Sequence, residues 1–227
     1  MNSKYSHLLW RGLFLLVGIV LIVVLVFARN NYLGSLYFVK ATRGVHTEEV
    51  FEENLKKSIA FDHAHGYSNV VLARLLLGRN DLQGAEEMQK DGMKSFTSVR
   101  TFAQMGLIRE LQGDANDAKK WYEKSMTMNP KNTDCLERLG VIALEQGDSS
   151  KVKEYAARIH DLDMNHVNAS YLLAKDCENR NDFDAALRHY INISTVMSRV
   201  KVLGCKPLFE DDEIGNSISR LIKASKK

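Results

Sequence analysis

The sequence predicts an all-α protein, with an N-terminal transmembrane helix followed by an α-solenoid of about four helical hairpins and a C-terminal capping helix. Three observations predict this class. The chain of 227 residues contains only 2 prolines, and proline costs about 3 kcal/mol in a helix interior. Residues 12–28 are apolar and uncharged. A two-residue turn signal recurs at intervals of 33 or 34 residues.

The apolar run reads GLFLLVGIVLIVVLVFA. At about 1.5 Å per residue it spans roughly 26 Å, close to the hydrocarbon core of about 30 Å. Residues 8–10 lengthen the span if Arg11 extends to the headgroups, so we expect a lipid bilayer to cover residues 8–28. The aromatic, uncharged residues 32–38 are expected at the membrane interface.

Two alternatives to a retained anchor exist. A cleavable signal peptide also begins with basic residues, but its apolar core usually runs about 7–15 residues, and the core here is longer. A buried core helix is disfavoured because the segment is apolar on every face. The sequence therefore favours a retained single-pass anchor.

The basic residues leave the membrane orientation nearly balanced. Lys4 and Arg11 precede the span, whereas Arg29, Lys40 and Arg43 follow it closely. A very short basic N-terminal tail usually stays in the cytoplasm. This favours export of the body across the membrane.

The rest of the chain excludes several function classes. Beyond residue 29 it carries 28 acidic and 28 basic side chains, so it lacks the basic excess that nucleic-acid binding needs. Cys135, Cys177 and Cys205 form neither a disulfide framework nor a zinc ribbon, and they leave the compartment open. No phosphate loop, dinucleotide-binding or nucleophile-elbow motif occurs. We therefore expect no enzyme, no cofactor and no small-molecule substrate.

Two histidines stand close together without predicting a metal site. His63 and His65 are two residues apart beside Asp62, and side chains at this spacing point to different sides of a helix. We expect them to lie in a turn between helices.

The recurring turn signal is a Gly or Asn followed by Asp. A helix commonly ends with a residue in the left-handed region, which Gly and Asn enter cheaply, and the next Asp can cap the following helix. Each pair therefore predicts a tight turn between two helices. The four pairs are Asn80-Asp81, Gly113-Asp114, Gly147-Asp148 and Asn181-Asp182.

Other positions keep the same register. A small residue follows each turn at Ala85, Ala118, Val152 and Ala186, and tyrosines stand four residues later at Tyr122 and Tyr190. With Gly106 and Asn129-Pro130, the second unit resembles the tetratricopeptide repeat (TPR) family. The usual tryptophan of the first helix is absent, since Phe102 and Leu136 stand in its place.

The register and the resemblance divide the chain into seven segments. Residues 46–65 read as the second helix of a degenerate half-repeat, whose partner is expected in the juxtamembrane stretch and would attach the solenoid stiffly to the anchor. The predicted segments are an anchor (1–31), a juxtamembrane half-repeat (32–65), four repeats (66–98, 99–132, 133–166 and 167–200) and a capping helix with a basic tail (201–227).

The last segment predicts a terminal cap. Gly204 and Pro207 break the preceding helix, and acidic residues 210–213 then open an amphipathic helix. Its apolar positions are Ile214, Ile218, Leu221 and Ile222. A solenoid needs such an element to cover its last repeat. Contact of the basic end with anionic lipid is the alternative.

The TPR resemblance implies a concave groove lined by the first helix of each repeat. The position of Val70 and Asp134, where chaperone-binding members need lysine, argues against binding of C-terminal carboxylates. The groove positions carried over from the family are Tyr67, Val70, Arg74, Leu77, Arg100, Ala103, Leu107, Glu110, Asp134, Glu137, Val141, Leu144, Asn168, Tyr171, Lys175 and Glu178.

Together these features predict a membrane-tethered protein–protein interaction adaptor or assembly factor. The expected partner is another protein, itself membrane-associated, with a segment that lies in the groove. The architecture is similar to that of bacterial inner-membrane TPR proteins that assist envelope assembly, secretion or cytochrome maturation. A permanent structural subunit of a larger membrane complex is the alternative.

Overall fold

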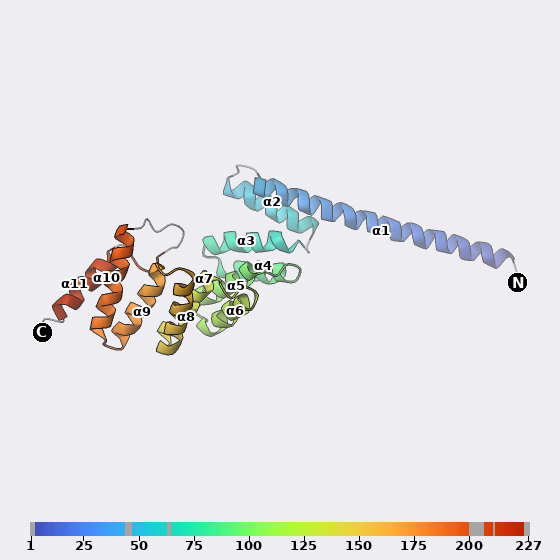
Figure 1. Ribbon diagram of the computed structural model, residues 1–227. Helices are drawn as coiled ribbons and strands as arrows, with labels where there is room; N and C mark the ends of the chain where they lie inside the picture. The colour runs from blue at the N-terminus through green and yellow to red at the C-terminus, as the bar shows by residue number, and fades with distance from the viewer. Residues whose placement is uncertain (1–2, 44–46, 63–64, 200–206, 211, 225–227) are drawn as a thin grey trace. The chain divides into compact units, whose positions relative to one another are not determined.

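The computed structural model describes residues 3–43, 47–62, 65–199, 207–210 and 212–224. In these ranges the chain forms eleven helices and no strand, which confirms the predicted fold class. Two compact units are present, an N-terminal unit (Met1–Thr97) and a C-terminal unit (Ser98–Lys227). Figure 1 shows the order of the helices.

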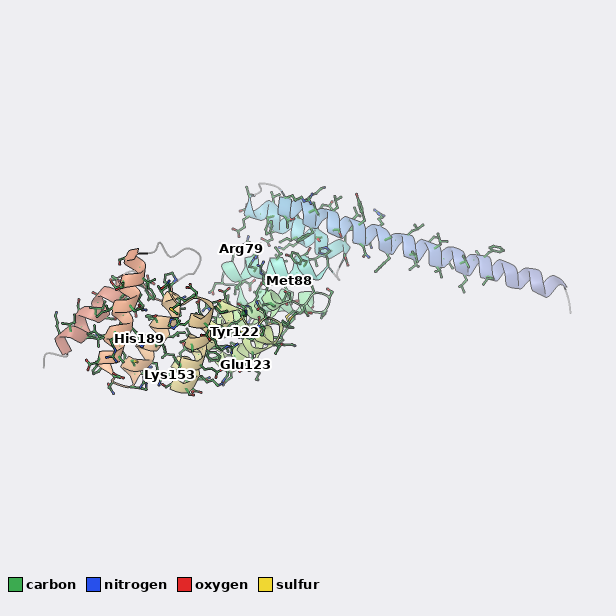
Figure 2. All side chains as sticks on the ribbon, in the orientation of Figure 1. Arg79, Met88, Tyr122, Glu123, Lys153 and His189 are labelled. Atoms are coloured by element: carbon green, nitrogen blue, oxygen red, sulfur yellow. The ribbon has the colours of Figure 1, made fainter. Side chains whose placement is uncertain are left out.

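The N-terminal unit contains four helices. They are α1 (Ser3–Arg43), α2 (Glu48–Phe61), α3 (Gly66–Gly78) and α4 (Leu82–Met93). Helix α1 is 41 residues long and has two parts. The large apolar side chains from Leu13 to Phe27 are 48–70% exposed, and the side chains of this part project on every side of the helix (Figure 2). The second part packs against α2.

The hairpin of α1 and α2 depends on a close approach at Gly34. A Cβ atom there would lie 2.7 Å from the Cβ of Asp62, so a larger residue does not fit. The Ser58 hydroxyl donates to the Gly34 carbonyl oxygen over 2.7 Å. The Tyr37 and Phe61 rings stack with their centroids 5.4 Å apart. The juxtamembrane stretch is thus the helical partner that the half-repeat was expected to have.

Two of the aromatic residues expected at the membrane interface, Tyr37 and Phe38, pack within this hairpin. Tyr37 stacks on α2, and Phe38 packs against a buried cluster that contains Leu55 and Leu72. Tyr37 and Phe38 therefore help to build the first hairpin, whereas Tyr32 is 67% exposed, and the interfacial placement of residues 32–38 stays a prediction.

A chain of hydrogen bonds ties the start of α3 to this hairpin. Ser58 Oγ lies 2.7 Å from Ser68 Oγ, which in turn lies 2.8 Å from His65 Nδ1. Because Ser58 gives its proton to Gly34, Ser68 must donate to Ser58, and His65 Nδ1–H must donate to Ser68. His65 therefore has a structural role, whereas His63 lies outside the described residues.

The C-terminal unit contains three hairpins and a terminal helix. The hairpins are α5 (Val99–Leu111) with α6 (Ala115–Met128), α7 (Thr133–Glu145) with α8 (Ser149–Leu162), and α9 (Val167–Asn179) with α10 (Phe183–Arg199). The terminal helix is α11 (Glu213–Ala224).

All four predicted turns have the predicted conformation. The first residue of each pair has a positive φ, from 59° at Asn181 to 83° at Gly113. Each following Asp accepts a hydrogen bond from a backbone N–H three residues later, over 2.9–3.1 Å. The turn chemistry read from the sequence is confirmed.

The small residues after the turns lie at the helix contacts. Ala85, Ala118, Val152 and Ala186 are all fully buried. In the second predicted repeat, Gly106 faces Tyr122 so closely that a Cβ atom would lie 2.6 Å from the ring. The aromatic ring fills the space that the glycine leaves, which explains why both occur in one repeat.

Helix α11 covers the last hairpin. Ile214 and Leu221 are buried in a cluster with Tyr190 and Ile193 of α10. Ile222, expected on the same apolar face, is exposed. The predicted capping role is therefore confirmed, whereas Gly204 and the basic residues after Ala224 lie outside the described residues.

Candidate protein-binding surface

The first helices of the C-terminal unit are joined by polar side chains. Arg138 Nη1 of α7 lies 2.9 Å from Glu110 Oε1 of α5. Asn168 Nδ2 of α9 donates to Glu137 Oε2 of α7 over 2.8 Å. We call the predicted groove positions on these helices the first-helix face: Arg100, Ala103, Leu107, Glu110, Asp134, Glu137, Val141, Leu144, Asn168, Tyr171, Lys175 and Glu178.

Two of these positions are occupied by internal contacts in the same way. The Tyr122 hydroxyl donates to Glu110 over 2.7 Å, and the Tyr190 hydroxyl donates to Glu178 over 3.0 Å. Burial and the neighbouring carboxylate raise the pKa of both tyrosines, so both hydroxyls remain protonated donors. An arginine also pairs with each glutamate, Arg138 with Glu110 and Arg220 with Glu178.

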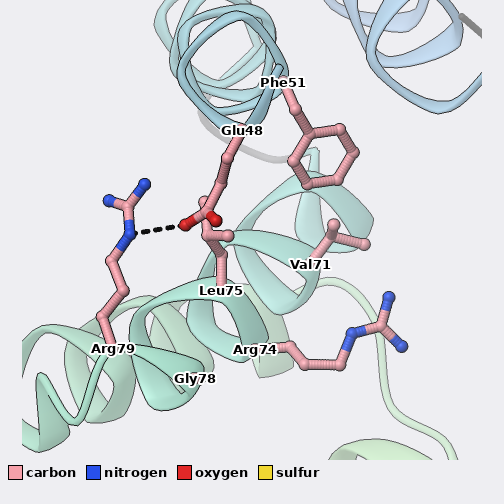
Figure 3. A pocket seen from close by; sticks show the side chains of 7 residues that line it. All are labelled: Glu48, Phe51, Val71, Arg74, Leu75, Gly78 and Arg79. Atoms are coloured by element: carbon pink, nitrogen blue, oxygen red, sulfur yellow. Dashed lines mark hydrogen bonds and ion pairs between the residues drawn. The ribbon is translucent and has the colours of Figure 1, made fainter. Parts of the chain in front are cut away.

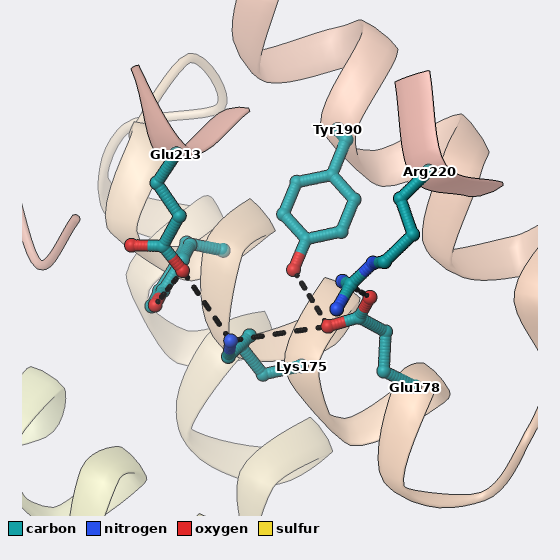
Figure 4. A network of polar contacts seen from close by, with 6 residues as sticks. Lys175, Glu178, Tyr190, Glu213 and Arg220 are labelled. Carbon is teal, nitrogen blue, oxygen red and sulfur yellow. Dashed lines mark hydrogen bonds and ion pairs between the residues drawn. The ribbon is translucent and has the colours of Figure 1, made fainter. Parts of the chain in front are cut away.

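This repeated Tyr–Glu–Arg arrangement was missed by the sequence analysis. Figure 4 shows the copy around Glu178, where Tyr190 and Arg220 converge on one carboxylate. In both copies the tyrosine follows the glutamate by twelve residues, a spacing that could have revealed the pair. For Glu110 the arginine comes from the next repeat. For Glu178, in the last repeat, the arginine is Arg220 of the capping helix α11.

Glu137 is a buried acid within the first-helix face. Its carboxylate accepts from Asn168, and its Oε1 lies 3.2 Å from His166 Nε2. Burial raises the pKa of Glu137 to about 7, although the Asn168 hydrogen bond opposes the shift. Burial also lowers the pKa of His166. Glu137, one of the predicted groove residues, is therefore a structural acid.

The face on α9 is covered by the chain itself. The backbone N–H of Leu208 donates to Asn168 Oδ1 over 3.0 Å. The next residue, Phe209, is buried with its ring 5.2 Å from that of Tyr171. Glu213 Oε1 then accepts from Tyr171 and Lys175 over 2.8 and 3.3 Å. All four predicted groove residues of the fourth repeat thus contact other parts of this chain.

The remaining positions of the first-helix face are accessible. Arg100 and Asp134 are exposed. Further along α5 and α7, C-terminal to these two charges, lie the half-buried apolar side chains Ala103, Leu107, Val141 and Leu144. This apolar strip, with a basic group at the start of α5 and an acidic group at the start of α7, can hold an apolar segment that carries complementary charges.

The four predicted positions of the N-terminal unit differ in accessibility. Val70 is buried against Gly92, where a Cβ atom would lie 2.7 Å from Val70 Cγ2, and so it cannot contact a partner. Tyr67 is partly exposed and packs edge-on against Phe38 and Phe96. Arg74 is exposed and Leu77 is half-buried.

Arg74 lines a cavity of about 350 Å³ between α2 and α3. Figure 3 shows its apolar side chains, with the Arg79 guanidinium directed toward Glu48 and the Arg74 side chain on the other side of α3. Arg79 contacts Glu48 and Glu52 over 2.7 and 2.6 Å, which holds α2 on α3. The cavity is lined by Glu48, Phe51, Val71, Arg74, Leu75, Gly78 and Arg79.

No group of three or more His, Cys, Asp or Glu side chains that could hold a metal ion occurs among the described residues. Cys135 and Cys177 are buried free thiols, and burial raises the pKa of each. Cys205 lies outside the described ranges.

The chain was compared with known proteins. No protein-family model matches the chain. The chain is 25% identical over 182 residues to the BBSome complex member BBS4 of Bos taurus. The aligned region covers 79% of this chain and 32% of BBS4. It therefore spans about a third of the length of this relative.

Two solved structures match most of the chain. YrrB, described as a TPR protein with an unusual peptide-binding site, has a TM-score of 0.60 at 12% identity and covers 89% of this chain and 91% of its own. PilW, described as a widely conserved type IV pilus biogenesis factor, has a TM-score of 0.66 at 11% identity and covers 85% and 87%. The chain has the TPR fold.

Within this TPR array the first-helix face is the surface formed by successive repeats. Val70, Glu137 and Asn168, three residues expected in the groove, are instead part of the packed interior. The accessible part of the face in the C-terminal unit lies on α5 and α7.

The buried acid of this TPR array gives a pH prediction. Because the folded pKa of Glu137 exceeds its ordinary value of 4.5, the native state keeps a proton that the unfolded state releases. Stability is thus lost as the pH rises from about 4.5 through 7. Glu137→Gln should leave the free energy of unfolding unchanged at pH 4.5 and raise it at pH 8, by at most about 3 kcal/mol.

Urea titrations of the full chain at both pH values measure this difference. His166 has a lowered pKa, so its own contribution to stability rises with pH up to its ordinary 6.5, which is opposite in sign to the effect of Glu137. Glu145→Gln, at the exposed end of α7, is the matched control and should change neither value. Equal effects of Glu137→Gln at both pH values would contradict the buried acid.

Proposed function

We propose that this protein is a membrane-tethered adaptor or assembly factor that holds a segment of another protein along the accessible first-helix face. The strip on α5 and α7 supplies the apolar contact surface. Arg100 and Asp134 supply the charges that orient the bound segment.

One observation supports attachment to a membrane. The exposed apolar side chains from Leu13 to Phe27 belong to the same unbroken helix whose second part packs in the first hairpin. Such a surface is costly to leave in water, at about 25 cal/mol per Å², whereas lipid covers it without cost. The helix from Leu13 to Arg43 is long and apolar enough to cross a bilayer.

The continuity of α1 determines what the tether does. No flexible linker separates the apolar part from the hairpin, because α1 runs on through Gly34 to Arg43. The first hairpin is therefore held close to the membrane. Confinement of both proteins to one membrane raises the effective concentration of a membrane-associated partner.

The proposal includes a topology and a set of repeats. We place the body on the periplasmic side of a bacterial inner membrane, because the short basic N-terminal tail favours the cytoplasm. Fusion of a compartment-sensitive reporter to the C-terminus tests this placement. The helix pairs support the assignment of repeats to residues 66–98, 99–132, 133–166 and 167–200.

Site-specific photocrosslinking in membranes tests the binding role. A photoreactive residue at Leu107 or Val141 should give an adduct with one and the same protein, and the exposed position Lys153 on α8 should give none. Asp134→Lys should weaken that adduct at least tenfold and keep the helical content, because Asp134 is exposed. Equal labelling at Leu107 and Lys153 would rule out the first-helix face.

A permanent structural subunit is the second candidate. Helix α10 favours it, since this second helix exposes the large apolar side chains Phe183, Ile191 and Met197. Detergent extraction followed by size analysis separates the two functions. A stoichiometric complex that survives high salt supports the subunit, whereas a monomer that captures a partner segment supports the adaptor.

A further inference from the structure

We infer that residues 207–209 (Pro-Leu-Phe) are an internal ligand of the first-helix face: α9 recognises a non-helical segment with an adjacent Leu-Phe pair, and this chain fills the site with its own. The inference rests on the proposed function, because it identifies the chemistry of the partner segment. A partner with the same pair would compete with residues 207–209.

The backbone of the segment is recognised by a side chain that is already fixed. Asn168 is fully buried, and its Nδ2 donates to Glu137 while its Oδ1 accepts from the Leu208 N–H over 3.0 Å. The two contacts determine the orientation of the amide. Pro207 has no backbone N–H, so the N–H of Leu208 is the first backbone donor in residues 207–209. The hydrogen bond to Asn168 Oδ1 recognises the backbone N–H at this position and does not depend on which side chain the residue carries.

The two side chains are bound by different parts of the surface. Leu208 packs against the buried cluster formed by α6 to α9, which contains Leu136 and Leu172. Phe209 belongs to the neighbouring cluster with Ile214 and Leu221, and its ring contacts Tyr171. A Leu-Phe pair therefore fills two adjacent apolar sites, which gives the surface its selectivity.

Capping of the last hairpin explains Phe209, which shares the cluster of α10 and α11, but it does not explain Leu208. Ile214 and Leu221 of α11 already cover α10, and Arg220 already pairs with Glu178. Leu208 instead reaches the cluster of the preceding hairpins, in which none of the described residues of α10 or α11 takes part. The segment thus extends beyond the cap and occupies the surface as a bound ligand does.

The charges around the site complete the description of the partner. Lys175 binds Glu213, four residues after Phe209, and the Tyr171 hydroxyl donates to the same carboxylate. A competing segment should therefore carry a carboxylate about one helical turn after its Leu-Phe pair. The partner segment has the form Leu-Phe-x-x-x-Glu.

Fluorescence anisotropy on the full chain in detergent micelles tests the inference. The probe is a labelled peptide with the sequence of residues 206–213, KPLFEDDE. The Leu208→Ala/Phe209→Ala variant should bind it at least tenfold more tightly than the unaltered chain, because the internal competitor is weakened. Leu208→Ala alone, at a half-buried position that leaves Phe209 in place, should bind at least threefold more tightly.

Altered peptides distinguish the contacts without further changes to the protein. Methylation of the leucine nitrogen removes the donor to Asn168 and should weaken binding to the double variant at least tenfold, as should replacement of the Leu-Phe pair by Ala-Ala. Phe183→Ala, an exposed apolar position on α10, is the matched control and should bind like the unaltered chain.

Two results would overturn the inference. One is equal affinity of Leu208→Ala and the unaltered chain at unchanged helical content. The other is equal binding of the methylated and parent peptides. Neither result affects the crosslinks at Leu107 and Val141, so failure of the internal ligand is distinguishable from failure of the adaptor function.

Discussion

Gly106→Leu should unfold the array around the second predicted repeat, with a loss of free energy of unfolding of about 3 kcal/mol or more. A Cβ atom at Gly106 would lie 2.6 and 2.7 Å from two carbons of the Tyr122 ring. The ring cannot move aside cheaply, because it is buried and its hydroxyl is bonded to Glu110. Thermal unfolding of the full chain, followed by circular dichroism at a helical wavelength, measures the loss.

Two comparisons make this prediction specific. Gly140→Leu should cost less, because a Cβ atom there meets the flexible end of Leu172 at 2.6 Å and no other atom closer than 3.6 Å. Gly215→Ala on α11 is the control, since its Cβ meets nothing within 4 Å, and it should be neutral or stabilising by up to about 1 kcal/mol. An unchanged melting temperature of Gly106→Leu would contradict the packing of this hairpin.

Leu21→Arg/Val24→Arg should move the protein out of the membrane fraction. Each arginine near the centre of a spanning helix costs about 2.5–3.5 kcal/mol, so the two together oppose insertion by about 5–7 kcal/mol. Both positions lie in the exposed part of α1, and no packed residue of the hairpin is changed. Carbonate extraction followed by detection of the protein in pellet and supernatant measures the change.

The matched control keeps the apolar character of the helix. Leu21→Ala/Val24→Ala changes the same two positions without adding a charge, and this variant should remain in the pellet. Mass determination of the extracted protein also tests cleavage, because a retained anchor leaves residues 1–28 on the mature chain. Retention of the arginine variant in the pellet, with an intact N-terminus, would refute the tether.

The turns show what could be predicted from short-range chemistry. A left-handed Gly or Asn and a capping Asp interact with backbone groups only three or four residues away, so Gly113-Asp114 specifies its turn without help from the rest of the fold. The fully buried Ala118 and Val152 follow from the same register. The apolar run of α1 could be predicted in the same way, because its length and apolar character are read directly from consecutive residues.

The groove residues show where this reasoning stops. Family positions place Glu137 and Asn168 on the inner side of their helices, but burial depends on neighbours in the next repeat. Tyr37 and Phe38 read as interfacial because an aromatic run looks the same in a lipid headgroup layer and against α2. The position of Leu208 follows from a contact with a residue forty positions earlier.

The sequence by itself determined the helices, their turns, the repeat register and the long apolar segment, because each is encoded by residues close together in the chain. Only the tertiary structure decided which face residues are accessible, which acid is buried, and that residues 207–209 cover α9. These properties depend on contacts between residues 28 to 42 positions apart on different helices. Such residues become buried and form their hydrogen bonds only after the repeats have stacked.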